Sequence, residues 1–134
     1  MRVPSHDAVA LALPFAASSA SIARTQLKMW LTDLGQPTDV IEDSRLVVSE
    51  LVGNAVRHAR PLDDGTVIVA WNKADAGLDI AVTDGGAHTA PHAVDAAASD
   101  LAGRGLTIVQ ELSSRWWLET GRSRSTVHAL VAMY

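Results

Sequence analysis

The sequence predicts an α+β domain in which one layer of helices covers one face of a mixed, mainly antiparallel sheet. The chain has 134 residues, which suits a single domain (1–134) with one core. Hydrophobic residues make up 48% of it and aromatic residues only 4%, so alanine, valine and leucine must fill most of that core. Strand-like runs occur in adjacent pairs, and sequential strands favour antiparallel pairing.

Local patterns predict each element in turn. An apolar run closed by Pro14 predicts the first strand. Apolar residues at helical spacing predict two long helices, the first ended by Gly35 and the second capped by Thr38. Alternating apolar residues predict the later strands. The expected elements are strand 9–13, helix 19–34, helix 38–60, strands 67–71 and 78–82, helix 106–112, and strands 115–120 and 126–133.

Charge and composition exclude several classes of protein. The formal net charge is −4, without the basic excess of a nucleic-acid-binding surface, so we expect no direct nucleic-acid partner. Cysteine is absent, which excludes disulfides and thiolate metal sites. No stretch approaches the ~20 apolar residues that cross a bilayer, so we expect no membrane association and a cytoplasmic protein.

Three polar residues share one face of the second long helix. Glu50, Asn54 and His58 are four residues apart, close to one helical turn, while apolar residues between them face the core. A carboxylate and an amide oxygen are hard ligands that Mg²⁺ accepts. The carboxylate is also suited to take a proton from an attacking hydroxyl. The triplet alone is more typical of the solvated edge of an amphipathic helix.

Two further motifs lie near turns. Asp84 follows a buried strand and precedes Gly85 and Gly86, so it can accept a hydrogen bond from an exocyclic amine while glycine admits a flat ring; ordinary turn chemistry also explains it. The stretch 103–106, Gly-Arg-Gly-Leu, opens a helix after a loop over about 87–102, which is small, polar and expected to be mobile. Backbone N–H groups at such a helix start favour phosphate, although a solvated hinge has the same composition.

Together these motifs resemble the N, G1 and G2 boxes of the GHKL ATPase/kinase superfamily. The matching segments are Glu50-x-x-x-Asn54-Ala-x-x-His58, Val82-Thr-Asp84-Gly-Gly86 and Gly103-Arg104-Gly105-Leu106. The chain is similar to the anti-sigma-factor serine kinase branch, of the RsbW and SpoIIAB type, over nearly its whole length. The resemblance implies a Bergerat-type two-layer sandwich.

The resemblance also implies cofactors, roles and partners. ATP and Mg²⁺ would bind, with Asn54 as the Mg²⁺ ligand and Glu50 as the general base. The remaining nucleotide-binding residues would be His58, Asp84 as the adenine-amine acceptor, Gly86 beside the ring, Gly103, Arg104, Gly105 and Leu106 on the phosphate side, and Thr126 near adenine. The implied partners are a sigma factor, an anti-anti-sigma (STAS-type) protein whose serine is phosphorylated, and a second copy in a homodimer.

The sequence departs from the family pattern at two positions. His88 stands where the G1 box usually has its second glycine, and Ser125 stands where glycine commonly precedes the last-strand threonine. Both departures concern the adenine side and lid closure and leave Glu50 and Asn54 untouched. They motivate a second hypothesis, a non-catalytic ATP-binding interaction module. A third, the catalytic fragment of a sensor histidine kinase, predicts a preceding helix with an acceptor histidine, whereas this sequence begins with a strand.

Histidines and tryptophans offer two other interpretations. His88 and His92 have a zinc-compatible spacing, but the intervening Pro91 disfavours a helix and no third ligand is evident. Trp116 and Trp117 are adjacent, so on a strand one ring must point away from the core. That ring is either a partner-contact anchor or covered by a helix.

Overall fold

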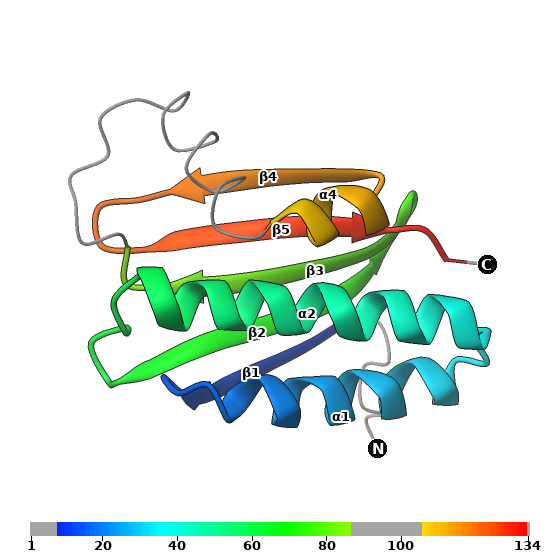
Figure 1. Ribbon diagram of the computed structural model, residues 1–134, viewed down its shortest axis with the longest axis horizontal. Helices are drawn as coiled ribbons and strands as arrows, with labels where there is room; N and C mark the ends of the chain where they lie inside the picture. The colour runs from blue at the N-terminus through cyan, green and yellow to red at the C-terminus, as the bar shows by residue number, and fades with distance from the viewer. Residues whose placement is uncertain (1–7, 87–105, 134) are drawn as a thin grey trace, which may run out of the picture.

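The computed structural model describes residues 8–86 and 106–133. Five strands form one sheet in the order β1-β2-β3-β5-β4. Each of its four pairings is antiparallel, so the described sheet has no parallel pair. This confirms the α+β class (Figure 1). The strands are β1 (Ala8–Pro14), β2 (Thr66–Ala74), β3 (Gly77–Asp84), β4 (Arg115–Thr120) and β5 (Ser125–Val131), and the helices are α1 (Ser19–Asp33), α2 (Thr38–His58) and α4 (Thr107–Leu112).

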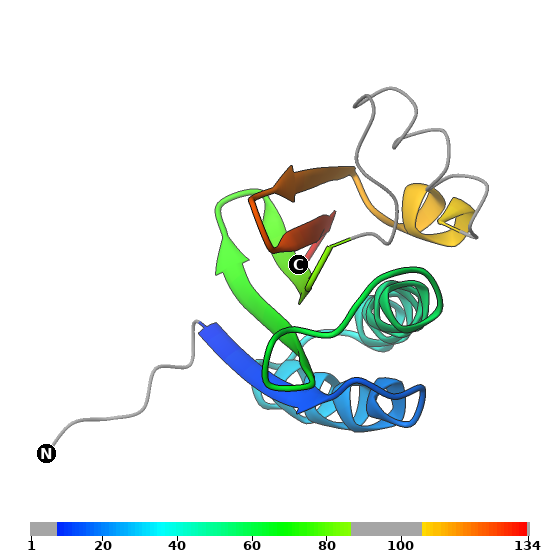
Figure 2. The ribbon, with the colours of Figure 1, turned by 90° about the vertical axis from the view of Figure 1, so that its left-hand side faces the viewer.

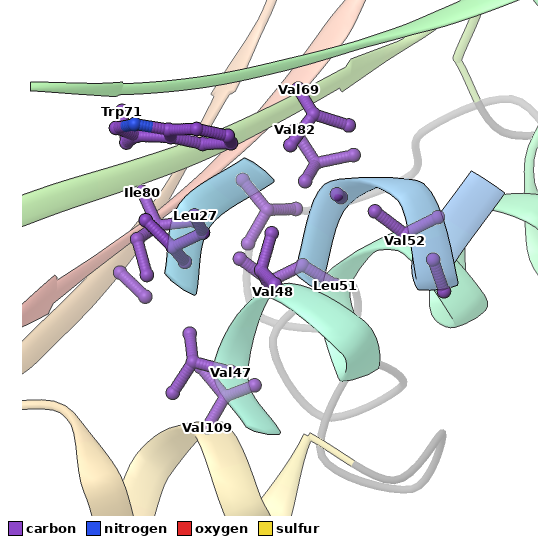
Figure 3. Packing of buried hydrophobic residues seen from close by; sticks show 14 of the residues in the cluster. Leu27, Val47, Val48, Leu51, Val52, Val69, Trp71, Ile80, Val82 and Val109 are labelled. Atoms are coloured by element: carbon purple, nitrogen blue, oxygen red, sulfur yellow. The ribbon is translucent and has the colours of Figure 1, made fainter. Parts of the chain in front are cut away.

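The core lies between the sheet and a single layer of helices. Figure 2 shows all the described helices on the same side of the sheet. Strands β2, β3 and β5 bury every second residue against them, which is the period of a half-buried strand. Figure 3 shows the contact between the layers, made by Leu27 of α1, Val47, Val48, Leu51 and Val52 of α2, Val69 and Trp71 of β2, Ile80 and Val82 of β3, and Val109 of α4.

The helix ends show one confirmed and one wrong prediction. Gly35 ends α1 in the left-handed region, at φ +74°, and its N–H donates to the Thr32 carbonyl 2.9 Å away. Thr38, predicted as the cap of α2, is instead its first helical residue. Pro37 takes the cap position because its φ of −70° and extended ψ deliver the chain directly into the helix.

The sheet face opposite the helices carries polar side chains at one end and mostly small side chains at the other. Adjacent rings divide as predicted: Trp116 packs against the core, and Trp117 lies on the open face. Trp117 stacks on His128 with ring centroids 4.7 Å apart, and the Arg115 guanidinium lies 4.7 Å from the Trp117 ring centroid. The described helices lie on the other side of the sheet from this open face (Figure 2). Of the described helices, none is both long and apolar enough to span a membrane.

Candidate functional site

The central helix α2 carries a buried polar atom that no described group satisfies. Asn54 is 6% exposed, and its Oδ1 has no hydrogen-bond partner among the described residues. Leaving such an acceptor unsatisfied costs about 1–3 kcal/mol, so the atom calls for an explanation. It is one of five such side-chain atoms among the described residues, with Trp30 Nε1, Ser44 Oγ, Arg45 Nε and Trp71 Nε1, and the only carboxamide oxygen of the five. Glu50 and His58, one turn to either side, are half-buried. The apolar residues of α2 set this helical phase, because their burial against the sheet fixes which face Asn54 occupies.

A buried carboxyl stands at the end of β3. Asp84 is 6% exposed, and burial raises its pKa to about 6, partly opposed by the Gly86 N–H. That N–H donates to Asp84 Oδ1 at 2.8 Å. Gly86 has φ +95°, a conformation that glycine adopts without strain. The turn therefore fixes the orientation of the carboxyl.

The raised pKa of Asp84 predicts a pH-dependent stability difference. The folded carboxyl binds a proton near pH 6, whereas the unfolded one does so near 3.8. The free energy of unfolding therefore falls as pH rises through 6, because a charge must then stay buried. We expect Asp84→Asn, which keeps the acceptor for the Gly86 N–H, to be more stable than wild type by about 2 kcal/mol at pH 7.5. Denaturant unfolding at pH 7.5 and pH 4 measures this, and most of the difference should be lost at pH 4. An equal difference at both pH values would contradict the buried charge.

Backbone hydrogen bonds bring the end of α2 and the end of β3 together. Beyond the helix, the Arg60 N–H donates to the Gly86 carbonyl at 2.9 Å. The Gly85 N–H donates back to the Arg60 carbonyl at 2.7 Å. The structure thus joins the segment that follows Asn54 to the turn that follows Asp84. The segments named from the sequence as N box and G1 box are therefore neighbours, and the ligand roles of their residues remain predictions.

The residues present fit a magnesium ion held mainly by a nucleotide. Within residues 8–86 and 106–133 no cluster of three histidine, aspartate or glutamate side chains could hold a metal. Mg²⁺ commonly keeps several waters and takes one or two protein oxygens plus substrate phosphates. The unsatisfied Asn54 Oδ1 is such an oxygen. Asn54 would therefore be the protein ligand, and the metal would neutralise phosphate charge.

The strand register does not support Thr126 beside adenine. Thr126 pairs with Thr83, and their hydroxyls are 2.8 Å apart. Both side chains lie on the open face, because the alternating residues of β3 and β5 face the helices. The partner of Asp84 is Ser125, which shares its face of the sheet. Ser125 is thus the hydroxyl nearest in register to Asp84, a relation that the sequence spacing had not revealed.

The phosphate-side residues are only partly described. Leu106 is fully buried in the core, so its side chain packs rather than contacts a ligand, and its carbonyl accepts the Gln110 N–H that begins α4. Gly103, Arg104 and Gly105 lie outside the described residues, as do His88, His92 and the loop predicted over 87–102.

Comparison with known proteins identifies the class to which this fold and site belong. The family model of the histidine kinase-like ATPase domain matches residues 13–130. The chain belongs to that family.

Within the family, the chain is similar to serine-protein kinase RsbW. It is 33% identical to RsbW of Listeria monocytogenes over 82 residues, which are 60% of this chain and 52% of that protein. It is 32% identical to RsbW of Listeria innocua over the same shares. The chain therefore spans about half the length of the curated relatives it matches.

Two solved structures share the fold. The RsbU and RsbW domains of a Mycobacterium tuberculosis protein align with a TM-score of 0.73 and 24% identity, over 98% of this chain and 34% of that one. The SiaB–SiaC complex of Pseudomonas aeruginosa aligns with a TM-score of 0.65 and 17% identity, over 92% of this chain and 88% of that one. At these identities the likeness shows the fold alone.

Proposed function

We propose that this chain binds Mg-ATP and transfers its γ-phosphoryl group to a serine of an anti-anti-sigma (STAS-type) protein, and that it also sequesters a sigma factor. The observation that carries the proposal is the unsatisfied, buried Asn54 Oδ1 on a helix joined to the turn after Asp84. The membership of the family and the similarity to serine-protein kinases support it.

Each described polar group has a separate task in the proposed reaction. The Asp84 carboxylate accepts a hydrogen bond from the adenine amine, which is why its orientation by the Gly86 N–H matters. Asn54 supplies its free oxygen to the metal side of the phosphates. Phosphoryl transfer needs mainly positioning and charge neutralisation, so a small constellation suffices.

In this proposal Glu50 acts on the nucleophile. It lies one helical turn before Asn54 on α2 and is half-buried. In the proposed step the serine oxygen forms a bond to the γ-phosphorus, and the bond to the β-phosphate oxygen breaks, releasing ADP. The serine proton passes to the Glu50 carboxylate. The test is transfer of label from γ-labelled ATP to the partner's serine, with Glu50→Gln as the decisive variant.

We also propose that the protein forms a homodimer through the open face of the sheet. Part of this face carries small side chains, which allow two sheets to approach closely. Its polar end carries charges of both signs: Arg115, and the carboxylates of Asp79 and Glu119 that lie 3.0 and 2.7 Å from the nitrogens of His128. A twofold axis can therefore bring opposite charges together. The small and aliphatic residues of the face include Ala8, Ala10, Ala12, Ile68, Ala70, Ala81 and Leu130.

Ala81→Arg tests this interface, because Ala81 lies on the central strand of the open face. We expect wild type to have the mass of a dimer and Ala81→Arg that of a monomer in size-exclusion chromatography with light scattering. Gln26→Arg adds the same charge at an exposed position of α1 and should stay dimeric. A monomeric wild type, or a dimeric Ala81→Arg protein, would refute the interface.

A non-catalytic ATP-binding module is the second candidate function. The burial of Leu106 is the observation that favours it. A lid hinge requires freedom at its end, whereas Leu106 is fully buried in the core. In that case Mg-ATP would bind and the Glu50→Gln substitution would change no transfer rate, because none would be measurable.

A further inference from the structure

The two backbone hydrogen bonds between Arg60 and the turn at 85–86 leave very little space at Gly85. A Cβ added to Gly85 would lie 2.1 Å from the Pro61 carbonyl oxygen and 2.9 Å from its carbonyl carbon. Both are backbone atoms, so no side-chain rotation relieves the overlap. The neighbouring Gly86 differs: an added Cβ there would meet nothing within 4 Å, and its φ of +95° alone favours glycine. Position 85 thus requires glycine because the Pro61 carbonyl lies too close for a side chain, and position 86 favours glycine because its φ is positive.

The segment that crowds Gly85 is itself held in place. Pro61 has a fixed φ, and the next residue, Leu62, is 7% exposed. The Leu62 N–H donates to the Thr66 carbonyl at 2.9 Å, and the Gly65 N–H donates to the Leu62 carbonyl at 2.8 Å. A side chain at 85 would therefore displace the end of β3 from the end of α2, rather than push a loose loop aside.

We propose that Gly85 is a positioning residue that sets the separation between Asn54 and Asp84. Asp84 is the adjacent residue on the β3 side, and Asn54 lies on the last turns of α2, whose exit at Arg60 is hydrogen-bonded to Gly85. The inference rests on the proposed function, since only a nucleotide held at both residues depends on their separation. A ligand that spans two fixed groups loses affinity when either moves, and an error of about 1 Å can cost roughly 100-fold in a reaction.

Gly85→Ala separates positioning from simple stability by using two ligands. Adenosine would reach only the Asp84 end of the site, whereas Mg-ATP would span Asp84 and Asn54. We expect Gly85→Ala to weaken Mg-ATP binding about tenfold or more and adenosine binding less than about threefold. A merely destabilised protein would lower the folded fraction for both ligands alike, and circular dichroism melting monitors that fraction. An unchanged ratio of the two affinities would overturn the proposal.

Gly121→Ala is the matched control. An added Cβ at Gly121 would lie 3.7 Å from the Arg124 carbonyl oxygen, an ordinary contact, in the exposed turn between β4 and β5. Both affinities should match those of wild type.

Amide hydrogen exchange tests the hydrogen-bonded contact between Arg60 and the turn at 85–86 without any nucleotide. In wild type the amides of Arg60 and Gly85 should be protected by the bonds they donate. In Gly85→Ala the amides of residues 60 and 85 should exchange at least about tenfold faster, while those in the middle of β2 and β3 keep their rates. If wild type bound neither ligand, the proposed function would fail while this readout still decided the role of Gly85. Unchanged protection in Gly85→Ala would overturn it.

Discussion

Glu50→Gln is expected to slow phosphoryl transfer to the partner's serine by at least about 100-fold, because general-base catalysis contributes about 10²–10⁴-fold. Glutamine keeps the size and hydrogen-bonding shape of the side chain but cannot accept the serine proton. The substitution leaves Asn54 and Asp84 in place, so the affinity for Mg-ATP should stay within about threefold of wild type. A fall in transfer without a fall in binding is the signature of a group that acts in the transition state.

The measurement is single-turnover transfer from γ-labelled ATP to a purified partner domain. Glu111→Gln removes an exposed carboxylate from α4 and should transfer at the wild-type rate. Equal labelling by wild type and Glu50→Gln would show that Glu50 is not the base. Loss of binding and transfer together would assign it a binding role instead.

Asn54→Ala is expected to maintain or raise the stability of the protein while it lowers ATP affinity and phosphoryl transfer. Removal of the buried, unpartnered Oδ1 eliminates an unsatisfied acceptor, so the variant should melt at the same temperature as wild type or higher. The same change removes the proposed protein ligand of Mg²⁺. We therefore expect the Mg²⁺-dependent gain in ATP affinity to disappear and transfer to fall by about 100-fold, the scale of losing one preorganised electrostatic group.

Asn72→Ala provides the comparison for Asn54. Asn72 lies on β2, and its side-chain amide donates to the Lys73 carbonyl at 3.2 Å in an exposed position. That variant should retain both Mg²⁺ dependence and transfer. If Asn54→Ala were strongly destabilised instead, the Asn54 oxygen would have a structural partner, and its assignment to the metal would be wrong.

Periodicity made most of the fold predictable. The alternation in β2 and β3 and the apolar stripe of α2 are local patterns, and burial follows directly from them. The shared face of Glu50, Asn54 and His58 was predicted from the same helical spacing, whereas the near-complete burial of Asn54 was not. The prediction that Thr38 caps α2 was wrong because Pro37 and Thr38 are both suited to the start of a helix. Pro37 occupies the N-cap position, where no side chain makes a capping hydrogen bond.

Features that depend on pairing between distant segments were not predictable. The register between β3 and β5 decides that Ser125, and not Thr126, faces the same side as Asp84, and no spacing within either strand contains that information. The demand for glycine at position 85 comes from the Pro61 carbonyl, whose approach is a tertiary contact. The raised pKa of Asp84 likewise follows from burial beneath the helices rather than from its neighbours in sequence.

Calorimetric titration of the wild-type chain with ATP, in the presence and absence of Mg²⁺, tests the nucleotide site most directly. We predict saturable binding of one ATP per chain, at least about tenfold tighter with Mg²⁺, because the ion would link the phosphates to Asn54. The absence of binding at millimolar ATP with Mg²⁺, or equal affinity with and without the ion, would contradict the assignment of Asn54 and Asp84 to a Mg-ATP site.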